Sequence, residues 1–173
     1  MRVKTVLRKL LGLCRATVVV DWGLADDSGG GRPRPVVWVR AKVRRRGRCG
    51  RCGALSSWYD RGDGERRWRH VDVAFATCVL VADAPRVNCP AHGPTVAAVP
   101  WARHGSAFSQ AFEDLVVHDA IVGNKQAAAD RYGISWRAVN NMCVRVATEA
   151  LGRVDLLDGL VAIAIDEVKY KKG

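Results

Sequence analysis

The chain has 173 residues, which suffices for one ordinary domain or two small ones and excludes a large enzyme barrel. Hydrophobic residues make up 49% of it and charged residues 26%, a balance that excludes a disordered tail. No apolar run approaches the roughly 18 residues of a membrane-spanning helix, and no clean cleavage site follows the basic N-terminus, so we expect a cytoplasmic protein without a membrane partner.

The net charge of +11 is concentrated at the start of the chain. Residues 1–53 carry 14 basic and 3 acidic side chains, whereas residues 54–173 carry 14 of each. Such a concentration repels itself unless a polyanion lies nearby, so it predicts phosphate contacts with nucleic acid; a solvated face in an arginine-rich chain is the alternative. The cations expected to make these contacts are Arg40, Lys42, Arg44, Arg45, Arg46, Arg48 and Arg51.

The first expected elements are a helix and two strands. A short amphipathic helix is predicted by apolar residues at helical spacing, namely Val3, Val6, Leu7, Leu10 and Leu11. Residues 18–22 (VVVDW) and 36–43 (VVWVRAKV) predict strands, joined by a polar turn over residues 25–34. The second strand leads directly into the arginine-rich stretch.

Two short motifs, CGRCG at 49–53 and CPAHG at 89–93, each hold a pair of soft ligands separated by two residues. That spacing lets a tight turn aim both side chains at one tetrahedral ion. We therefore predict a structural zinc ion bound by Cys49, Cys52, Cys89 and His92. Because four protein ligands fill the coordination sphere, no position is left for a catalytic water. Unconnected thiols and a surface histidine are the alternative.

The insert between Cys52 and Cys89 is 36 residues long and needs structure of its own. Residues 68–75 and 77–81 predict strands that follow the turn-rich residues 60–64, which together indicate a zinc-clasped β-hairpin module.

Three further side chains are spare ligand candidates, namely His70, Cys78 and His104. For His70 and Cys78 we favour a packed or hydrogen-bonded strand side chain over a metal ligand.

Beyond a linker marked by two prolines, the pattern becomes helical. Residues 108–117 predict a first helix. The second is KQAAADRY, capped by Asn124 and ended by Gly133, and the third, 136–151, is capped by Ser135.

The last two helices and their short turn predict a helix-turn-helix that reads a major groove. Asparagine pairs with adenine, and arginine pairs with guanine or phosphate. The predicted DNA contacts here are Ser135, Arg137, Asn140, Asn141 and Arg145. We assign Trp136 and Cys143 to the core, and residues 101–104 to a packed linker in preference to a minor-groove contact.

The final stretch, LVAIAI at residues 160–165, predicts a buried strand followed by Asp166. A buried strand that ends in a carboxylate is typical of the catalytic sheet of metal-dependent nucleases, where the carboxylate points toward Mg²⁺. Glu167 points to the opposite face of such a strand and is a poor second ligand.

The order of these parts resembles the N-terminal part of bacterial insertion-sequence transposases of the ISL3 family. The matching stretches are CGRCG, YDRGDGERRWRHVDV, ADAPRVNCPAHGPTVAAVPWARHG, the helical segment from Phe108, and IAIDEVKYKKG. The resemblance implies a zinc-binding domain, a helix-turn-helix with residues 136–151 as recognition helix, and an RNase H-like core with a DDE carboxylate triad. By the same resemblance Asp166 is the first catalytic aspartate, with Mg²⁺ required only in a full-length relative.

We thus expect an α+β protein divided into four parts. They are an N-terminal helix and first strand (1–35), a zinc-binding β module (36–100), a helix-turn-helix domain (101–155), and the start of a truncated catalytic domain that contributes the first strand of an incomplete RNase H-like core (156–173).

The expected function is to bind double-stranded DNA at transposon ends, in association with the nucleoid. The chain lacks the second aspartate and the glutamate of the triad, so we expect it to bind DNA without cutting it. A second copy or an intact transposase is a further expected partner. The alternatives are a free-standing zinc-containing transcriptional regulator and an RNA-binding zinc module, the latter disfavoured because no aromatic-rich stacking sheet is evident.

Overall fold

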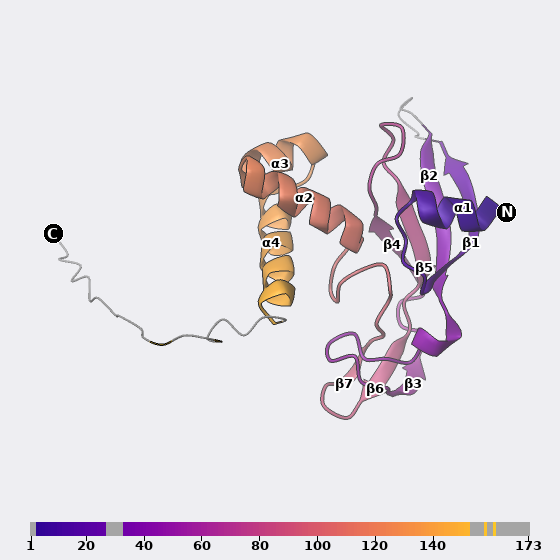
Figure 1. The fold of residues 1–173 in the computed structure, drawn as a ribbon. Helices are drawn as coiled ribbons and strands as arrows, with labels where there is room; N and C mark the ends of the chain where they lie inside the picture. The colour runs from indigo at the N-terminus through magenta and orange to yellow at the C-terminus, as the bar shows by residue number, and fades with distance from the viewer. Residues whose placement is uncertain (1–2, 27–32, 153–157, 159–160, 162–173) are drawn as a thin grey trace.

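A computed structural model describes residues 3–26, 33–152, 158 and 161. Within them the fold is mixed α+β, with two small sheets followed by a group of three helices (Figure 1). The elements are α1 (Val3–Leu10), β1 (Thr17–Ala25), β2 (Arg34–Ala41), the 3-10 helix η1 (Val43–Arg45), β3 (Ser57–Asp60), β4 (Glu65–Arg69), β5 (Val79–Asp83), β6 (Arg86–Cys89), β7 (Gly93–Val96), α2 (Gln110–Val122), α3 (Lys125–Tyr132) and α4 (Trp136–Leu151).

The larger sheet has four strands in the order β1-β2-β5-β4. β1 and β2 form the expected antiparallel hairpin, and β4 pairs antiparallel with β5. β2 and β5 run parallel, with Val36–Trp38 opposite Val79–Val81. The N-terminal hairpin and part of the insert between the cysteine motifs therefore share one sheet, and the expected boundary at residues 35 and 36 falls inside β2.

One face of this sheet carries the main core. Trp68, Leu80 and Val37 are at most 3% exposed and pack with Leu11 and Leu13, which follow α1. Trp101 enters the same core from the linker, and its ring meets that of Trp68 edge to face at 5.5 Å between centroids. The linker is thus packed in place, as the sequence predicted.

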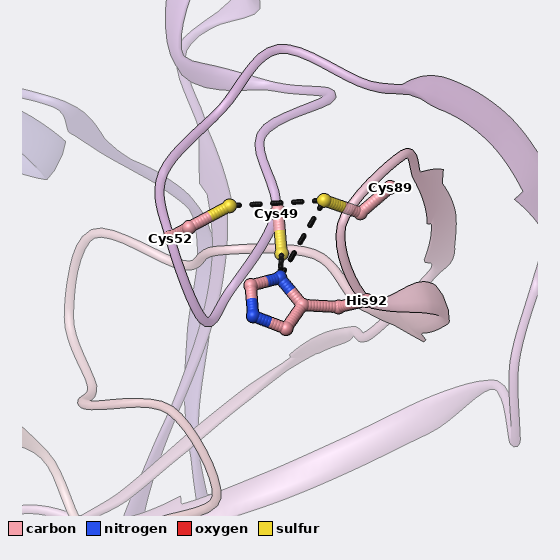
Figure 2. Close-up of side chains that lie close together, drawn as sticks. All are labelled: Cys49, Cys52, Cys89 and His92. Atoms are coloured by element: carbon pink, nitrogen blue, oxygen red, sulfur yellow. Dashed lines mark hydrogen bonds between the residues drawn. The ribbon is translucent and has the colours of Figure 1, made fainter.

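The smaller sheet has three strands in the order β3-β6-β7. Its core is small, because only Cys49, Val87, Cys89 and Ala97 are buried together there. Two of these four are predicted metal ligands, and they lie where the loop after η1 meets the β6–β7 turn (Figure 2). An aliphatic cluster of this size buries little apolar surface, so the sheet needs another source of stability.

The predicted strand 68–75 was largely wrong, because β4 runs from Glu65 to Arg69 and overlaps the prediction only at Trp68 and Arg69. Beyond it the chain makes a tight turn in which Val73 bridges Ala76. Two residues of this turn, Ala74 and Phe75, have positive φ angles of 50° and 66°. The alternating hydrophobic pattern continues through residues whose backbone cannot extend a strand.

The three predicted helices are present, and the caps predicted at Asn124 and Ser135 are confirmed, whereas the Ser109 cap of α2 was not predicted. The side chains of Ser109, Asn124 and Ser135 accept hydrogen bonds from the backbone N–H three residues later, at each helix N-terminus. Gly133 ends α3 in the left-handed conformation with φ 58°. The apolar residues that pack the three helices together are Phe112, Val116, Val117, Ala128, Ala129, Val139 and Met142.

Trp136 corrects one assignment, because it lies on the surface with 50% of its area exposed. It is the first residue of α4, and its indole faces the Lys125 ammonium at 5.4 Å instead of the core. Cys143 packs partly buried against the helical core, as expected. The predicted strand 160–165 lies outside the described residues apart from Val161, and Asp166 lies outside them entirely.

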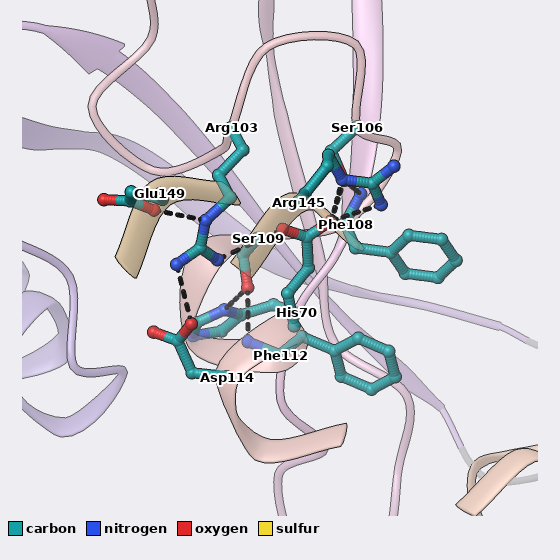
Figure 3. Close-up of polar contacts among 10 residues, drawn as sticks. His70, Arg103, Ser106, Phe108, Ser109, Phe112, Asp114, Arg145 and Glu149 are labelled. Atoms are coloured by element: carbon teal, nitrogen blue, oxygen red, sulfur yellow. Dashed lines mark hydrogen bonds and ion pairs between the residues drawn. The ribbon is translucent and has the colours of Figure 1, made fainter. Parts of the chain in front are cut away.

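The helices join the larger sheet through a polar junction (Figure 3). The backbone N–H of Arg69 donates to Ala107, and its guanidinium donates to the Tyr132 carbonyl at 2.6 Å. Next to it His70 is 1% exposed, with Nε2 at 2.8 Å from the Leu11 carbonyl and Nδ1 at 2.7 Å from Ser109 Oγ. His70 is therefore a buried connector, as the sequence favoured, and not a metal ligand.

Glu113 is the most deeply placed charge at this junction, with no exposed area. Its carboxylate accepts hydrogen bonds from Ser106 Oγ at 2.7 Å, Arg103 Nη1 at 3.1 Å and Arg145 Nε at 2.9 Å. Arg103 also binds Glu149 at 2.6 Å (Figure 3). One buried carboxylate thus ties the linker to both α2 and α4.

We expect Glu113→Gln to lower the free energy of unfolding by about 3 kcal/mol, because it leaves two guanidinium groups without their buried counter-charge. Asp114→Asn is the matched control: it removes another Arg103 partner, but one that is 56% exposed, and should cost under about 1 kcal/mol. Urea denaturation followed by circular dichroism measures both. Equal losses of unfolding free energy in the two variants would contradict this prediction.

Burial lowers the pKa of His70, although its bond to Leu11 opposes the shift. The unfolded imidazole takes up a proton below about pH 6.5 while the folded one resists, so stability should fall by up to about 1.4 kcal/mol per pH unit below that value. His70→Gln should flatten the dependence between pH 7 and 5.5. His118→Gln, in which the original side chain is 73% exposed, should keep the wild-type slope. Identical slopes for all three proteins would refute this assignment.

Candidate metal centre and nucleic-acid interface

The four predicted zinc ligands come together in space. One ligand atom from each of Cys49, Cys52, Cys89 and His92 lies within 4.8 Å of the others. The Cys52 and Cys89 sulfurs are 3.7 Å apart, and His92 Nδ1 lies 3.7 Å from Cys49 Sγ and 3.6 Å from Cys89 Sγ. Tetrahedral zinc with ordinary bond lengths places sulfurs roughly 3.8 Å apart and a sulfur and nitrogen roughly 3.6 Å apart. The donor set therefore fits this ion in type, number and spacing (Figure 2).

Each pair of ligands lies on a tight turn, and the local sequence favours that turn. In the first turn, the Gly53 N–H donates to the Cys49 carbonyl at 2.9 Å, and Gly53 has a φ of 73°. In the second, the His92 N–H donates to the Cys89 carbonyl at 3.2 Å, and the next residue, Gly93, has a φ of 64°. The glycines are needed because a side chain strains the backbone at such angles.

The first turn is anchored on the smaller sheet. Cys49 forms a β-bridge with Ala97, and the Gly50 N–H donates to the Val96 carbonyl at 3.1 Å. A Cβ atom on Gly50 would come within 2.6 Å of that carbonyl oxygen and 2.4 Å of His104 Nδ1. Only glycine lets the turn approach this closely.

The electrostatics of the cluster differ between its cysteines: the backbone hydrogen bond at Ala54 lowers the pKa of Cys52, but burial and the hydrogen bonds with Cys49 and Cys89 outweigh it and leave that pKa raised. The hydrogen bond with His92 lowers the pKa of Cys89 to about 6, so this thiol readily supplies a thiolate. Cys49 and Cys89 are buried, whereas Cys52 and His92 are exposed. With four protein ligands the centre has the closed arrangement of structural sites.

The spare candidates lie outside this set. Cys78 is fully buried, and burial raises the pKa of its thiol to about 11, which opposes thiolate formation. His104 lies against Gly50 and is therefore beside the first turn, but it is not among the four clustered groups.

The arginine-rich stretch leads into the first turn and continues within it. Arg40 lies near the end of β2, Arg44 and Arg45 lie in η1, and Arg51 lies between the two cysteines. These side chains, together with Lys42 and Arg46, are exposed. Arg48 differs, because it is half-buried and its Nη1 donates to the Gly53 carbonyl at 3.0 Å. It braces the turn.

The predicted contacts on α4 divide into two groups. Arg137 and Asn141 are exposed, lie one turn apart, and make no side-chain hydrogen bond within the described part of the chain. Asn140 Oδ1 accepts a bond from Lys125 Nζ at 2.7 Å, and Ser135 caps the helix. Arg145 is bound to the buried Glu113, so the structure places it in the junction instead of on the outer face.

Sequence reasoning missed Lys125. It begins α3, and its ammonium lies between the Trp136 ring and Asn140 at the start of α4. The cap at Asn124 places Lys125 at the first helical position, but its contacts depend on how the two helices pack.

Comparison with known proteins matches both the region of the metal ligands and the helical region to domains of one transposase family. Residues 45–92 match the zinc-finger of transposase IS204/IS1001/IS1096/IS1165, and residues 97–147 match the helix-turn-helix domain of transposase family ISL3. No solved structure matches the chain.

Two curated relatives match almost the whole chain. Both are described as transposase for insertion sequence element IS1557, from Mycobacterium tuberculosis strains CDC 1551 / Oshkosh and ATCC 25618 / H37Rv, and each is 43% identical over 172 residues. The match covers 99% of this chain and 39% of each relative's length. With both domain matches and this identity, the chain belongs to the ISL3 family of insertion-sequence transposases.

Proposed function

We propose that this chain binds double-stranded DNA at the ends of an insertion element, with the α3–α4 unit as a helix-turn-helix and α4 as its recognition helix. The observation that carries the proposal is the outward face of α4, where Arg137 and Asn141 are exposed and unengaged among the described residues. Arginine and asparagine are the side chains that read guanine and adenine edges bidentately. The match to the helix-turn-helix domain of this family supports the same conclusion.

Lys125 and Asn140 complete this surface. The Lys125 ammonium holds the Asn140 amide through its oxygen, at 2.7 Å, and so leaves the amide N–H₂ group for an acceptor on DNA. A lysine at this position also adds positive charge near the duplex backbone. The helix pair thus combines positioned polar groups with a phosphate-attracting charge.

The exposed arginines around the first turn supply the second DNA contact. Arg44, Arg45 and Arg51 are exposed and carry no acidic partner among the described residues. Their role is to bind phosphates without reading sequence. All three arginines belong to the basic excess concentrated within residues 1–53.

The ligand cluster holds a structural zinc ion in this proposal. Cys49, Cys52, Cys89 and His92 bind it, and the ion fixes the arginine-bearing loop to the β6–β7 turn. Association with a second copy or an intact transposase stays a prediction, because the described surface identifies no residue for it.

The zinc assignment predicts about one zinc ion per chain. Cys49→Ser and Cys89→Ser should lower this to near zero, because three remaining ligands bind zinc far more weakly. Cys14→Ser, which changes an exposed thiol outside the cluster, should retain the metal. Elemental analysis of the purified proteins measures the ratio. Chelation of the wild-type chain should weaken its fold and zinc should restore it; full stoichiometry in either cluster variant would refute the site.

The DNA proposal predicts that wild-type protein enriches a motif from a library of random 20-base-pair duplexes. Arg137→Ala combined with Asn141→Ala should lower affinity for that motif at least about tenfold, since each lost bidentate contact costs roughly 1–3 kcal/mol. Arg67→Ala is the matched control, since this arginine is 72% exposed on β4 and belongs to neither surface. Fluorescence anisotropy at fixed salt measures affinity. If the double variant still binds like the control, α4 is not the reading element.

A further inference from the structure

A groove opens at the join of the two sheets, and its described lining includes no residue of α4 and none of the four metal ligands. β2 extends to Ala41, but its pairing with β5 stops at Trp38. Past that point the two strands are no longer paired, and the groove is lined by residues 39–41 on one side and by Ala82, Asp83 and Pro85 on the other. The groove has a volume of about 920 Å³, at the upper end of the roughly 300–1,000 Å³ typical of ligand pockets.

The groove has an apolar floor and one prominent aromatic wall. Val87, Val99 and Trp101 contribute to the floor. Trp58, on β3, lines the groove and is 63% exposed. The large exposed indole has no structural role in the described core, yet it lies beside apolar surface where a flat, partly apolar ligand could stack.

The charged lining of the groove is mainly positive. Arg40, Arg46 and Arg61 line it, and Asp83 is the single acid among its described lining residues. Arg46 is held in position, because its Nε donates to the Ala41 carbonyl at 3.2 Å. The rest of its guanidinium remains able to donate to an anion, and the side chains of Arg40 and Arg61 are exposed.

We propose that this groove binds a short segment of single-stranded DNA, with a base stacked on Trp58 and the phosphates held by the three arginines. Base stacking on an aromatic ring beside a cationic track is the general way in which proteins bind single strands. A paired base cannot fill this role, since its faces are covered by neighbouring base pairs. The proposal rests on the proposed function only in taking DNA as the ligand.

An extended peptide is the competing occupant, because the unpaired edge of β2 could accept another strand. The charge pattern favours nucleic acid: three arginines against one acid suit a repeating polyanion, and a peptide backbone offers no base for Trp58 to stack on.

The test uses the full zinc-loaded chain and a fluorescein-labelled dT12 oligonucleotide. Trp58→Ala should weaken binding about five- to 100-fold, the loss expected for one stacked base, and Trp58→Phe should recover part of it. Trp22→Ala is the matched control, since Trp22 is 51% exposed but lies on β1 outside the groove. Arg61→Ala should make the plot of log affinity for dT12 against log salt concentration less steep, by about the slope that one phosphate contact contributes.

Separate outcomes distinguish this proposal from the proposed function. Trp58→Ala should leave affinity for a blunt 20-base-pair duplex unchanged, whereas the Arg137 and Asn141 double variant should lose duplex binding and keep dT12 binding. Equal dT12 affinity in the Trp58→Ala and Trp22→Ala proteins would overturn the groove proposal. So would tighter binding of rU12 than of dT12, which would indicate RNA, or binding of duplex but not dT12 by the wild-type chain.

Discussion

The meeting of Cys49 and Cys52 with Cys89 and His92 is the constraint on which the first half of the fold depends. Between the two pairs the chain forms β3, crosses to the larger sheet for β4 and β5, and returns in β6. The cluster therefore closes a loop that passes through both sheets. The aliphatic core around it is small, so a bound ion would supply stability that this sheet cannot obtain from apolar burial.

The second constraint is the polar junction between sheet and helices. Arg69, the last residue of β4, and the adjacent His70 bind two different helical segments through Tyr132 and Ser109. Glu113 then fixes the linker and α4 to α2. These bonds are buried or partly buried and directional, so they hold the helix-turn-helix in one orientation where apolar packing alone would allow sliding. The DNA contacts proposed for α4 and for the arginine-bearing loop would consequently belong to one framework.

Local features of the fold were predictable from the sequence, whereas features set by long-range pairing were not. The caps at Asn124 and Ser135 and the stop at Gly133 act within a few residues, and each lies where predicted. The ligand spacing likewise named four side chains that lie together. By contrast, nothing local indicates that β2 pairs parallel with β5, or that Arg145 finds a buried partner on α2. Lys125 and Trp58 were missed for the same reason, since their surroundings come from distant segments.

The shared four-stranded sheet limits how this protein can be divided or recombined. The segment that matches the family zinc-finger, residues 45–92, contains β4 and β5 but not β2, the strand on which β5 pairs. Excised at those limits, the finger would expose the edge of β5 and the face carrying Leu80 and Trp68. Residues 45–92 are therefore not an independently folding domain in this structure. In this chain, the smallest unit that keeps the four-stranded sheet whole must include the β1–β2 hairpin together with the finger.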